Sequence, residues 1–179
     1  DDTLIIFASD HGEEFKEHGR WRHGANLHAE TLNFPLIVKF PDQKTGARVE
    51  EAVQHIDLLP TILESAGLSV PNALEGRSLA AVGRADSPTA ELKSSGIYSH
   101  LRLGRGPLYE SVVSDQWKLI RRQREDGWEV SLFDWREDPA ETRNLAADRP
   151  VLAAVLSALI DAKVASFEAT ENAEEITLT

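Results

Sequence analysis

Near its start the chain reads Thr3-Leu4-Ile5-Ile6-Phe7-Ala8-Ser9-Asp10-His11-Gly12. The run up to Ala8 is apolar or β-branched without alternation, which predicts a strand buried on both faces of a sheet. Asp10 and His11 follow at the carboxyl end of that strand, where open α/β sheets bind ligands. Gly12 lets the backbone turn away. Because a carboxylate beside an imidazole suits a divalent cation, we expect Asp10 and His11 to be metal ligands.

A neighbouring aspartate and histidine have an alternative interpretation, a turn aspartate beside a surface histidine. The position directly behind a buried strand favours a site. The pairs His18-Gly19 and His23-Gly24, with His28 beyond them, favour it too. A glycine beside each imidazole lets side chain and backbone both approach a ligand. We therefore expect a functional site in this histidine-rich loop.

The composition limits the classes of function. The chain has 179 residues, of which 41% are hydrophobic, enough for one domain with a packed core. Its formal net charge of −11 without a basic tail argues against nucleic-acid binding. The absence of cysteine excludes disulfides and a cysteine nucleophile in this chain. The apolar stretch Val151–Ile160 falls short of the ~20 residues that cross a bilayer, so we expect no transmembrane segment.

The first part of the chain is expected to span residues 1–83. Its predicted strands and helices are Thr3–Ala8, Leu36–Phe40, Leu27–Asn33 (helix) and His55–Gly67 (helix). In the second helix Asp57 is the expected N-cap, and Gly67 is the residue that closes the helix in a left-handed conformation. Residues 84–96 are polar and form the expected linker. The opening strand needs neighbours on both sides, so we expect a fragment that lacks its N-terminal part.

Residues 97–179 are expected to form a smaller α+β unit. Its predicted strands are Ile97–His100, Glu110–Ser114, Trp117–Arg122 and Trp128–Asp134, with a hairpin turn at Arg124–Gly127. A final helix is expected over Arg149–Glu168, and the acidic tail from Ala169 is expected to fray.

Several short motifs, each weak by itself, follow one another along the chain in a characteristic order. They are Thr3–Glu14, Glu17–Gly19 with His23-Gly24, Phe34–Val38, Ile56–Thr61 closing at Ala66-Gly67, Trp117–Ile120, Leu132–Asp134 and Asp138–Leu145. In this order the chain resembles the C-terminal part of a sulfatase, within the alkaline-phosphatase-like superfamily. The resemblance implies an α/β fold class: the C-terminal part of a mixed sheet core, then a small antiparallel sheet with a C-terminal helix.

The resemblance also implies a reaction and its cofactors. Sulfatases hydrolyse sulfate esters of small molecules or carbohydrates, with a hydrated formylglycine as nucleophile and a divalent cation that stabilises charge. Calcium is the expected metal, with magnesium, manganese and zinc as alternatives. The formylglycine is expected in the missing N-terminal part. Members of the family are often exported, which favours a periplasmic or extracellular location.

The resemblance assigns roles to the site residues. Asp10 matches the family's metal-ligand aspartate, and His11 matches the neighbouring ligand, which is asparagine in many sulfatases. His23 stands where many members carry a lysine, so it is the expected catalytic contact to the sulfate or the general acid for the leaving alkoxide. His18 is a further catalytic candidate, or a residue that orients the loop. The alternative for each is a structural hydrogen bond within a loop.

Other residues of these motifs have mainly structural interpretations. We expect helix capping and packing for His55 and Asp57, and structural roles in the small unit for Lys118 and the Asp138–Leu145 stretch. Asp138 and Asn144 are expected to satisfy turn backbone groups. Weaker candidates for contact with an anionic substrate are Arg20, Arg22, His100, Arg102 and Arg105.

The chain departs from the sulfatase pattern in two respects. It has no Cys/Ser-x-Pro-x-Arg nucleophile motif, since Ser69–Ala73 lacks the final arginine, and it lacks the family's paired N-terminal aspartates. We therefore expect the chain alone to be inactive. Two alternatives stay open: a phosphodiesterase, phosphonate hydrolase or phosphoethanolamine transferase of the same superfamily, or a non-catalytic degenerate member.

Overall fold

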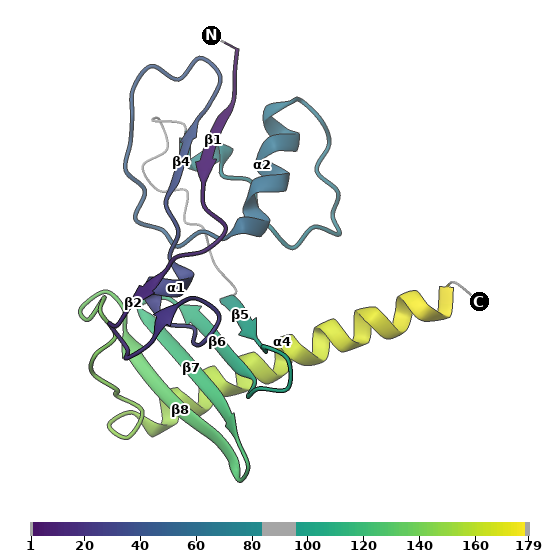
Figure 1. The fold of residues 1–179 in the computed structure, drawn as a ribbon. Helices are drawn as coiled ribbons and strands as arrows, with labels where there is room; N and C mark the ends of the chain where they lie inside the picture. Colours follow the sequence, from purple (N-terminus) through teal and green to yellow (C-terminus); the bar gives the residue numbers. More distant parts are fainter. Residues whose placement is uncertain (1, 84–95, 178–179) are drawn as a thin grey trace. The chain divides into compact units, whose positions relative to one another are not determined.

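The computed structural model describes residues 2–83 and 96–177, with side chains up to Phe167 and at Ala169 (Figure 1). These residues divide into two units by their contacts. The first unit contains Asp1–His11 and Phe34–Lys93, and the second contains Gly12–Asn33 and Ser94–Thr179. The predicted linker at 84–96 lies outside the described residues except for Gly96. The histidine-rich loop thus lies in the same unit as the C-terminal part of the chain.

The strand pair of the first unit consists of β1 (Ile5–Ala8) and β4 (Leu36–Lys39). They pair antiparallel, with Ile5 opposite Lys39 and Ala8 opposite Leu36. Both strands lie where the sequence predicts them, but the predicted burial of the first on both faces is wrong for this chain. Ile5 is 52% exposed and Phe7 61%, because the two strands have no third neighbour among the described residues.

The helical segment of the first unit begins with a 3₁₀ turn, η1 (His55–Asp57), and continues as α2 (Leu58–Ser65); α3 (Ala80–Gly83) follows. Asp57 is the N-cap residue of α2 as predicted, but its side chain makes no capping bond to that helix. Its buried carboxylate instead accepts the backbone N–H of Gln54, at 3.0 Å, and that of Arg77, at 3.0 Å. Gly67 has φ +72° and closes α2 as predicted, with a Leu68 N–H to Leu63 carbonyl bond of 2.9 Å.

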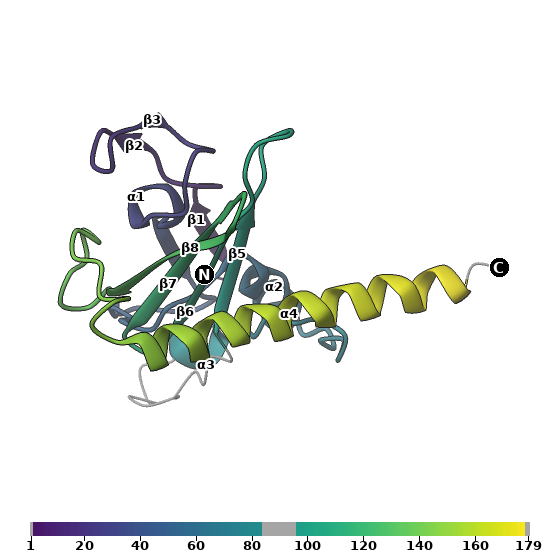
Figure 2. The ribbon, with the colours of Figure 1, turned by 90° about the horizontal axis from the view of Figure 1, so that it is seen from below.

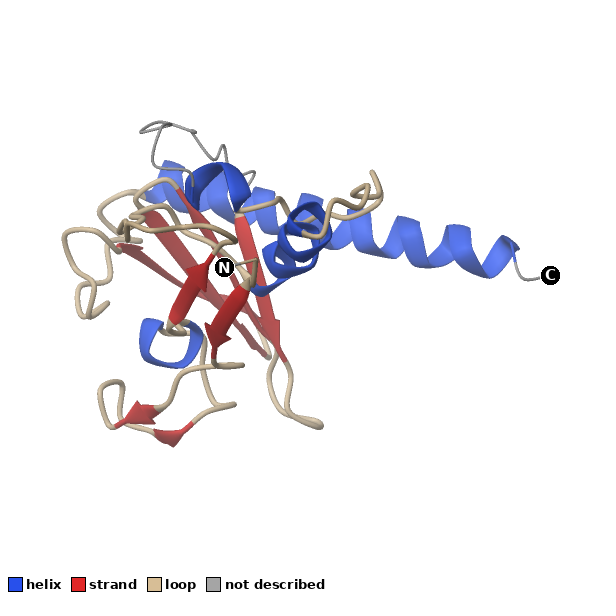
Figure 3. Ribbon diagram, turned by 90° about the horizontal axis from the view of Figure 1, so that it is seen from above, coloured by secondary structure: helices blue, strands red, loops and turns tan. Residues whose placement is uncertain are grey.

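The second unit is built on a four-stranded antiparallel sheet in the order β5-β6-β7-β8 (Figure 1), whose strands are drawn in red in Figure 3. The strands are β5 (Ile97–Leu101), β6 (Tyr109–Ser114), β7 (Trp117–Arg124) and β8 (Gly127–Asp134). All four predicted strands are therefore present, each longer than predicted by one or two residues. Arg124 pairs with Gly127 across the predicted hairpin turn, where Gly127 has φ +135°.

The long helix α4 (Pro150–Thr177) packs along one face of this sheet (Figure 2). Leu156 and Ile160 meet Leu119 and Leu132 there in the main hydrophobic core. The helix continues to Thr177, so the prediction that the tail frays from Ala169 is wrong. Its segment Pro150–Phe167 is long and apolar enough to span a membrane by length and composition, with mean hydropathy 1.6. Only 17% of this segment is buried in the structure, including the core residues Leu156 and Ile160.

The opposite face of the sheet is covered by the segment Gly12–Asn33. Side chains alternate between the two faces of a strand, so Ile120 and Phe133, next in sequence to the core residues Leu119 and Leu132, point to this other side. They form a second buried cluster with Leu27. The segment contains the short strands β2 (Glu14–Phe15) and β3 (Trp21–Arg22) and the helix α1 (Ala29–Leu32).

Candidate active site

Asp10 and His11 lie directly after β1, and their side chains lie side by side. The nearest oxygen of the Asp10 carboxylate lies 3.7 Å from His11 Nε2. The other carboxylate oxygen accepts the His11 backbone N–H at 3.1 Å, which fixes the turn. The Asp10 side chain is 88% exposed. Oxygen and nitrogen donors at this separation can bind one divalent cation at bond lengths of about 2.0–2.6 Å.

The backbone in front of this pair is held by His55. Its Nε2 donates a hydrogen bond to the Ser9 carbonyl at 2.8 Å, since a carbonyl oxygen only accepts. The His55 ring stacks on Phe34, with the ring centroids 3.7 Å apart. The Ser9 hydroxyl donates to the His11 carbonyl at 2.9 Å. His55 therefore orients the residue that precedes Asp10, a role beyond the packing that the sequence predicts.

The pair does not form a complete metal site by itself. Within the described ranges, no three histidine, aspartate or glutamate side chains converge as a metal-binding group. A cation bound by Asp10 and His11 would need further ligands.

A buried carboxylate, that of Glu14, builds the hairpin of β2 and β3. Glu14 is fully buried, and its Oε1 accepts the backbone N–H groups of His18, at 3.1 Å, and Arg20, at 2.6 Å. Its other oxygen accepts the amide of Asn26 at 2.6 Å. Glu17 accepts the Phe15 N–H at 2.5 Å. Both acidic side chains of the hairpin are therefore used to hold its backbone.

The same hairpin presents aromatic rings and cations to solvent. Phe15 and Trp21 are 63% and 60% exposed and meet edge to face, 6.2 Å apart. Among the residues with described side chains, no carboxylate forms an ion pair with Lys16, Arg20 or Arg22. Lys16 and Arg22 have φ of +86° and +71°, a left-handed conformation that is uncommon outside glycine. The hairpin is a cationic surface on a chain whose net charge is −11.

His23 follows this hairpin and is half-exposed. Its Nδ1 lies 3.3 Å from Glu13 Oε1. An imidazole beside a carboxylate keeps a defined orientation, and an exposed one can contact an anion when protonated.

His18 and His28 form a stacked pair beneath the hairpin. Their ring centroids are 3.6 Å apart and the ring planes differ by 6°. The Nδ1 of His18 lies 2.6 Å from Glu30 Oε1, and its Nε2 lies 3.1 Å from the Glu141 carbonyl oxygen. Burial lowers the pKa of His18, but the bonds to Glu141 and Glu30 outweigh burial and raise its pKa above 6.5.

Glu141 joins this pair to the sheet. Its Oε2 lies 2.8 Å from His28 Nδ1, and its Oε1 accepts from Lys118 Nζ at 2.5 Å. Glu141 and Lys118 are 2% and 3% exposed. Burial raises the pKa of Glu141, but the bond from His28 and the charge of Lys118 outweigh burial and hold its pKa below the ordinary value. Glu141 is therefore a buried anion that links two segments over a hundred residues apart in sequence.

A family model describes most of the chain. The model of the C-terminal domain of N-sulphoglucosamine sulphohydrolase matches residues 16–167. The chain belongs to this sulfatase family. It is the C-terminal portion of a sulfatase, as its motif order predicts.

Named relatives agree with the family. The chain is 32% identical over 148 residues to the uncharacterized sulfatase YidJ of Escherichia coli, covering 83% of this chain and 29% of the relative. It is 30% identical over 154 residues to an N-acetylglucosamine-6-O-sulfatase of Bacteroides thetaiotaomicron, covering 81% and 26%. The sulfatase chain therefore spans less than a third of the length of these relatives.

The fold is shared with solved structures. The structure of BT1596, a 2-O GAG sulfatase, matches with a TM-score of 0.75 at 22% identity, over 95% of this chain and 38% of that one. The structure of BT4656 in complex with its substrate D-glucosamine-2-N,6-O-disulfate matches with a TM-score of 0.72 at 23% identity, over 92% of this chain and 34% of that one. The alkaline-phosphatase-like fold class predicted from the sequence is thereby confirmed.

The structure places the predicted site residues of this sulfatase chain in two groups. Asp10 and His11 lie together in the first unit, whereas His18 and His23 lie in the second. The predicted turn roles are confirmed: the Asp138 carboxylate accepts the Arg143 N–H at 2.8 Å, and the side-chain amide oxygen of Asn144 accepts the Ala146 N–H at 2.9 Å.

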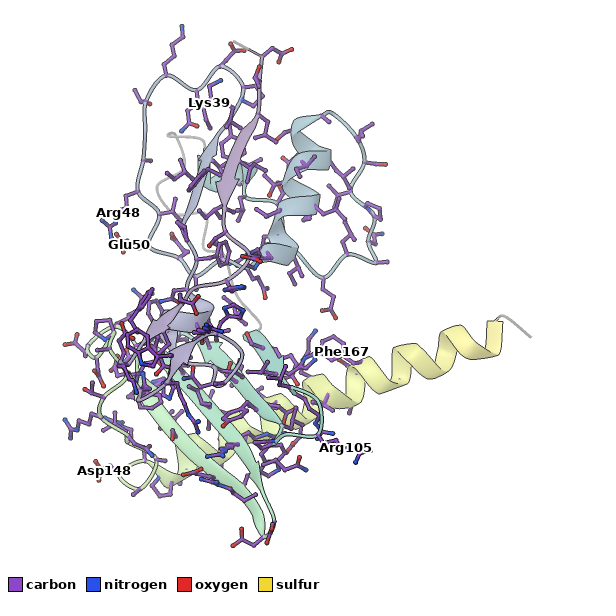
Figure 4. All side chains as sticks on the ribbon, in the orientation of Figure 1. Lys39, Arg48, Glu50, Arg105, Asp148 and Phe167 are labelled. Carbon is purple, nitrogen blue, oxygen red and sulfur yellow. The ribbon has the colours of Figure 1, made fainter. Side chains whose placement is uncertain are left out.

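The weaker candidates for substrate contact lie on β5 and in the loop that follows it. Arg102 donates to Gln123 Oε1 at 3.0 Å, and Arg105 extends from the loop after β5 (Figure 4). These positions do not test a role in substrate binding, which stays a prediction for Arg102, Arg105 and His100.

Several members of the site were not predicted from the sequence. They are Glu14, Glu30 and Glu141, together with the contacts of His28 and His55. Glu141 carried no signal beyond its place in the Asp138–Leu145 motif. Its partners lie in a distant part of the chain, and no spacing rule relates them.

Proposed function

We propose that this chain forms part of the active site of a metal-dependent sulfatase that hydrolyses sulfate esters of carbohydrates. The observation that carries the proposal is the adjacent Asp10 carboxylate and His11 imidazole at the end of β1, in a chain of the sulfatase family. The substrate class rests on named relatives, an N-acetylglucosamine-6-O-sulfatase and a structure that holds a sulfated glucosamine.

Asp10 and His11 are the proposed metal ligands of this chain. The donor set fits a divalent cation, since a carboxylate suits calcium and an imidazole is also accepted by transition metals. We propose calcium, with magnesium, manganese or zinc as alternatives. The cation would supply Lewis-acid stabilisation of negative charge on the ester oxygens. His55 would keep the Asp10–His11 turn in place through the Ser9 carbonyl.

The cationic hairpin and His23 are the proposed contacts to the anionic group. Lys16, Arg20 and Arg22 supply positive charge without ion-pair partners among the described side chains, and this charge attracts a sulfated substrate. His23, when protonated, donates a hydrogen bond to a sulfate oxygen or a proton to the leaving alkoxide. His18 orients the segment that carries His23.

The nucleophile is proposed to be a formylglycine outside this chain, because the chain contains no Cys/Ser-x-Pro-x-Arg motif. The proposed sulfatase activity therefore belongs to the longer protein, and these residues alone should not hydrolyse a sulfate ester.

Substitution of His23 tests the proposal. In the longer protein that contains this chain, His23→Ala should lower kcat/KM for N-acetylglucosamine 6-sulfate by roughly 10²–10³-fold, the usual cost of losing one charge-stabilising donor. His23→Lys, which restores a cation, should recover part of that loss. Lys44→Ala, which removes an exposed cation from the loop after β4, is the control.

Two outcomes would contradict the proposal. Unchanged kcat/KM in His23→Ala would show that His23 does not contribute to substrate binding or catalysis. A wild-type protein that hydrolyses a phenyl phosphonate ester and leaves the sulfate ester intact would replace the sulfatase activity with that of a phosphonate hydrolase.

A further inference from the structure

Both ring nitrogens of His18 face hydrogen-bond acceptors. Nδ1 meets a carboxylate oxygen of Glu30 at 2.6 Å, and Nε2 meets the backbone carbonyl of Glu141 at 3.1 Å. A neutral imidazole carries one N–H and would leave the second contact without a proton. An imidazolium carries two and satisfies both acceptors. The His18 and Glu30 side chains are only 17% and 13% exposed, so water has little access to replace either bond.

The charged groups around His18 also favour a cation there. Glu14 of β2 accepts the His18 backbone N–H, Glu30 of α1 and Glu141 of the loop after β8 contact its ring, and Lys118 of β7 pairs with Glu141. These contacts bring three carboxylates and one ammonium near His18. A positive charge on His18 brings the cluster closer to neutrality.

The stacked neighbour, His28, also contacts Glu141. Its Nδ1 donates to the buried Glu141 carboxylate at 2.8 Å, a bond that needs a single N–H. Its ring centroid lies 3.6 Å from that of His18. The two acceptors that face His18, by contrast, need an N–H on each of its ring nitrogens.

We propose that His18 is a positioning residue held as an imidazolium, whose two charge-assisted bonds hold the hairpin of the Gly12–Asn33 segment to α1 of the same segment and to the loop after β8. The segment carries His23, so the consequence for catalysis rests on the proposed function. The protonation of His18 and its two hydrogen bonds do not depend on that function.

The two hydrogen bonds of His18 should weaken at high pH. Since the pKa of His18 is raised by folding, its stabilising contribution is complete below the unfolded value of 6.5. The contribution is lost as the pH rises through the folded pKa, when one of the two bonds loses its proton. Charge-assisted hydrogen bonds are about twice as strong as neutral ones, so this loss should loosen the segment.

Amide hydrogen exchange tests the proposal in the longer protein that contains this chain. Peptides from residues 12–33 are compared at pH 6 and pH 9, with rates corrected for the intrinsic pH dependence. The wild type should exchange several times faster at pH 9 than at pH 6, because one charge-assisted hydrogen bond of His18 is lost there. His18→Gln should exchange fast at both pH values, and the control His100→Gln should behave as the wild type.

A second measurement protects the test against a variant that fails to fold. The ¹⁵N spectrum of the wild-type protein, labelled at histidine, reports whether both ring nitrogens of His18 are protonated at pH 7. A singly protonated ring, or wild-type exchange that is equal at both pH values, would overturn the proposal. If the protein shows both signatures but hydrolyses no sulfate ester, the proposed function fails and this inference stands.

Discussion

At the scale of single residues, a few buried carboxylates arrange the proposed site. Glu14 shapes the cationic hairpin, Glu30 holds His18, and Glu141 joins His28 to Lys118. Glu141 adopts φ +52°, which is uncommon for a non-glycine residue and aims its carbonyl at His18. Because the pKa of Glu141 is held low, its contribution to stability is complete at neutral pH and is lost as the pH falls through the folded pKa.

Loss of the Glu141 charge should be strongly destabilising. Glu141→Gln leaves Lys118 buried without a counter-ion, and breaking a buried pair in this way costs about 3–5 kcal/mol. The free energy of unfolding from urea titration of the longer protein measures the effect. Glu137→Gln, at an exposed position of the same loop, is the control and should change it by less than about 0.5 kcal/mol. Equal stability of both variants would show that the Glu141–Lys118 pair is not a structural link.

At the scale of elements, hydrophobic patterning predicted the sheet and the helices well. The runs at Tyr109–Ser114 and Trp117–Arg124 are long enough to read as strands, and both form. The strands β2 and β3 have only two residues each, too few for any period, and their hairpin depends on the buried Glu14. Helix α4 was predicted too short because the composition of the tail resembles that of a frayed end.

The sheet face of α4 should carry most of the stability of the second unit. Ile160 is fully buried against the sheet, whereas its neighbour Leu159 is 41% exposed. Ile160→Ala should lower the free energy of unfolding by about 2–5 kcal/mol, because it leaves a cavity in the core. Leu159→Ala removes a similar number of atoms from a partly exposed site and should cost less. If the two substitutions cost the same, the helix does not pack with the face described here.

At the scale of the whole molecule, the chain is a portion of a longer fold. It spans 29% of the YidJ sulfatase and 26% of the N-acetylglucosamine-6-O-sulfatase. The apolar run Thr3–Ala8 predicted a strand buried on both faces, yet β1 is exposed. An apolar sequence indicates that a strand is suited to a buried position. It does not indicate which segment of the protein covers the strand. We propose that further strands of the parent sulfatase cover β1 and β4.

The position of Asp10 and His11 could be predicted because it follows from local sequence, a strand end and a glycine. Their partners could not, since a metal site assembled from distant segments leaves no spacing signal. Side-chain contacts such as that of His55 with the Ser9 carbonyl were likewise beyond local patterns.

The metal content of the parent protein tests the central claim most directly. Elemental analysis of purified wild type, Asp10→Ala, His11→Ala and the hairpin-turn control Asp126→Ala compares bound divalent metal per chain. We predict that metal is present in the wild type and in the control and falls to background in Asp10→Ala, with a partial or full loss in His11→Ala. Equal metal in wild type and Asp10→Ala would contradict the account.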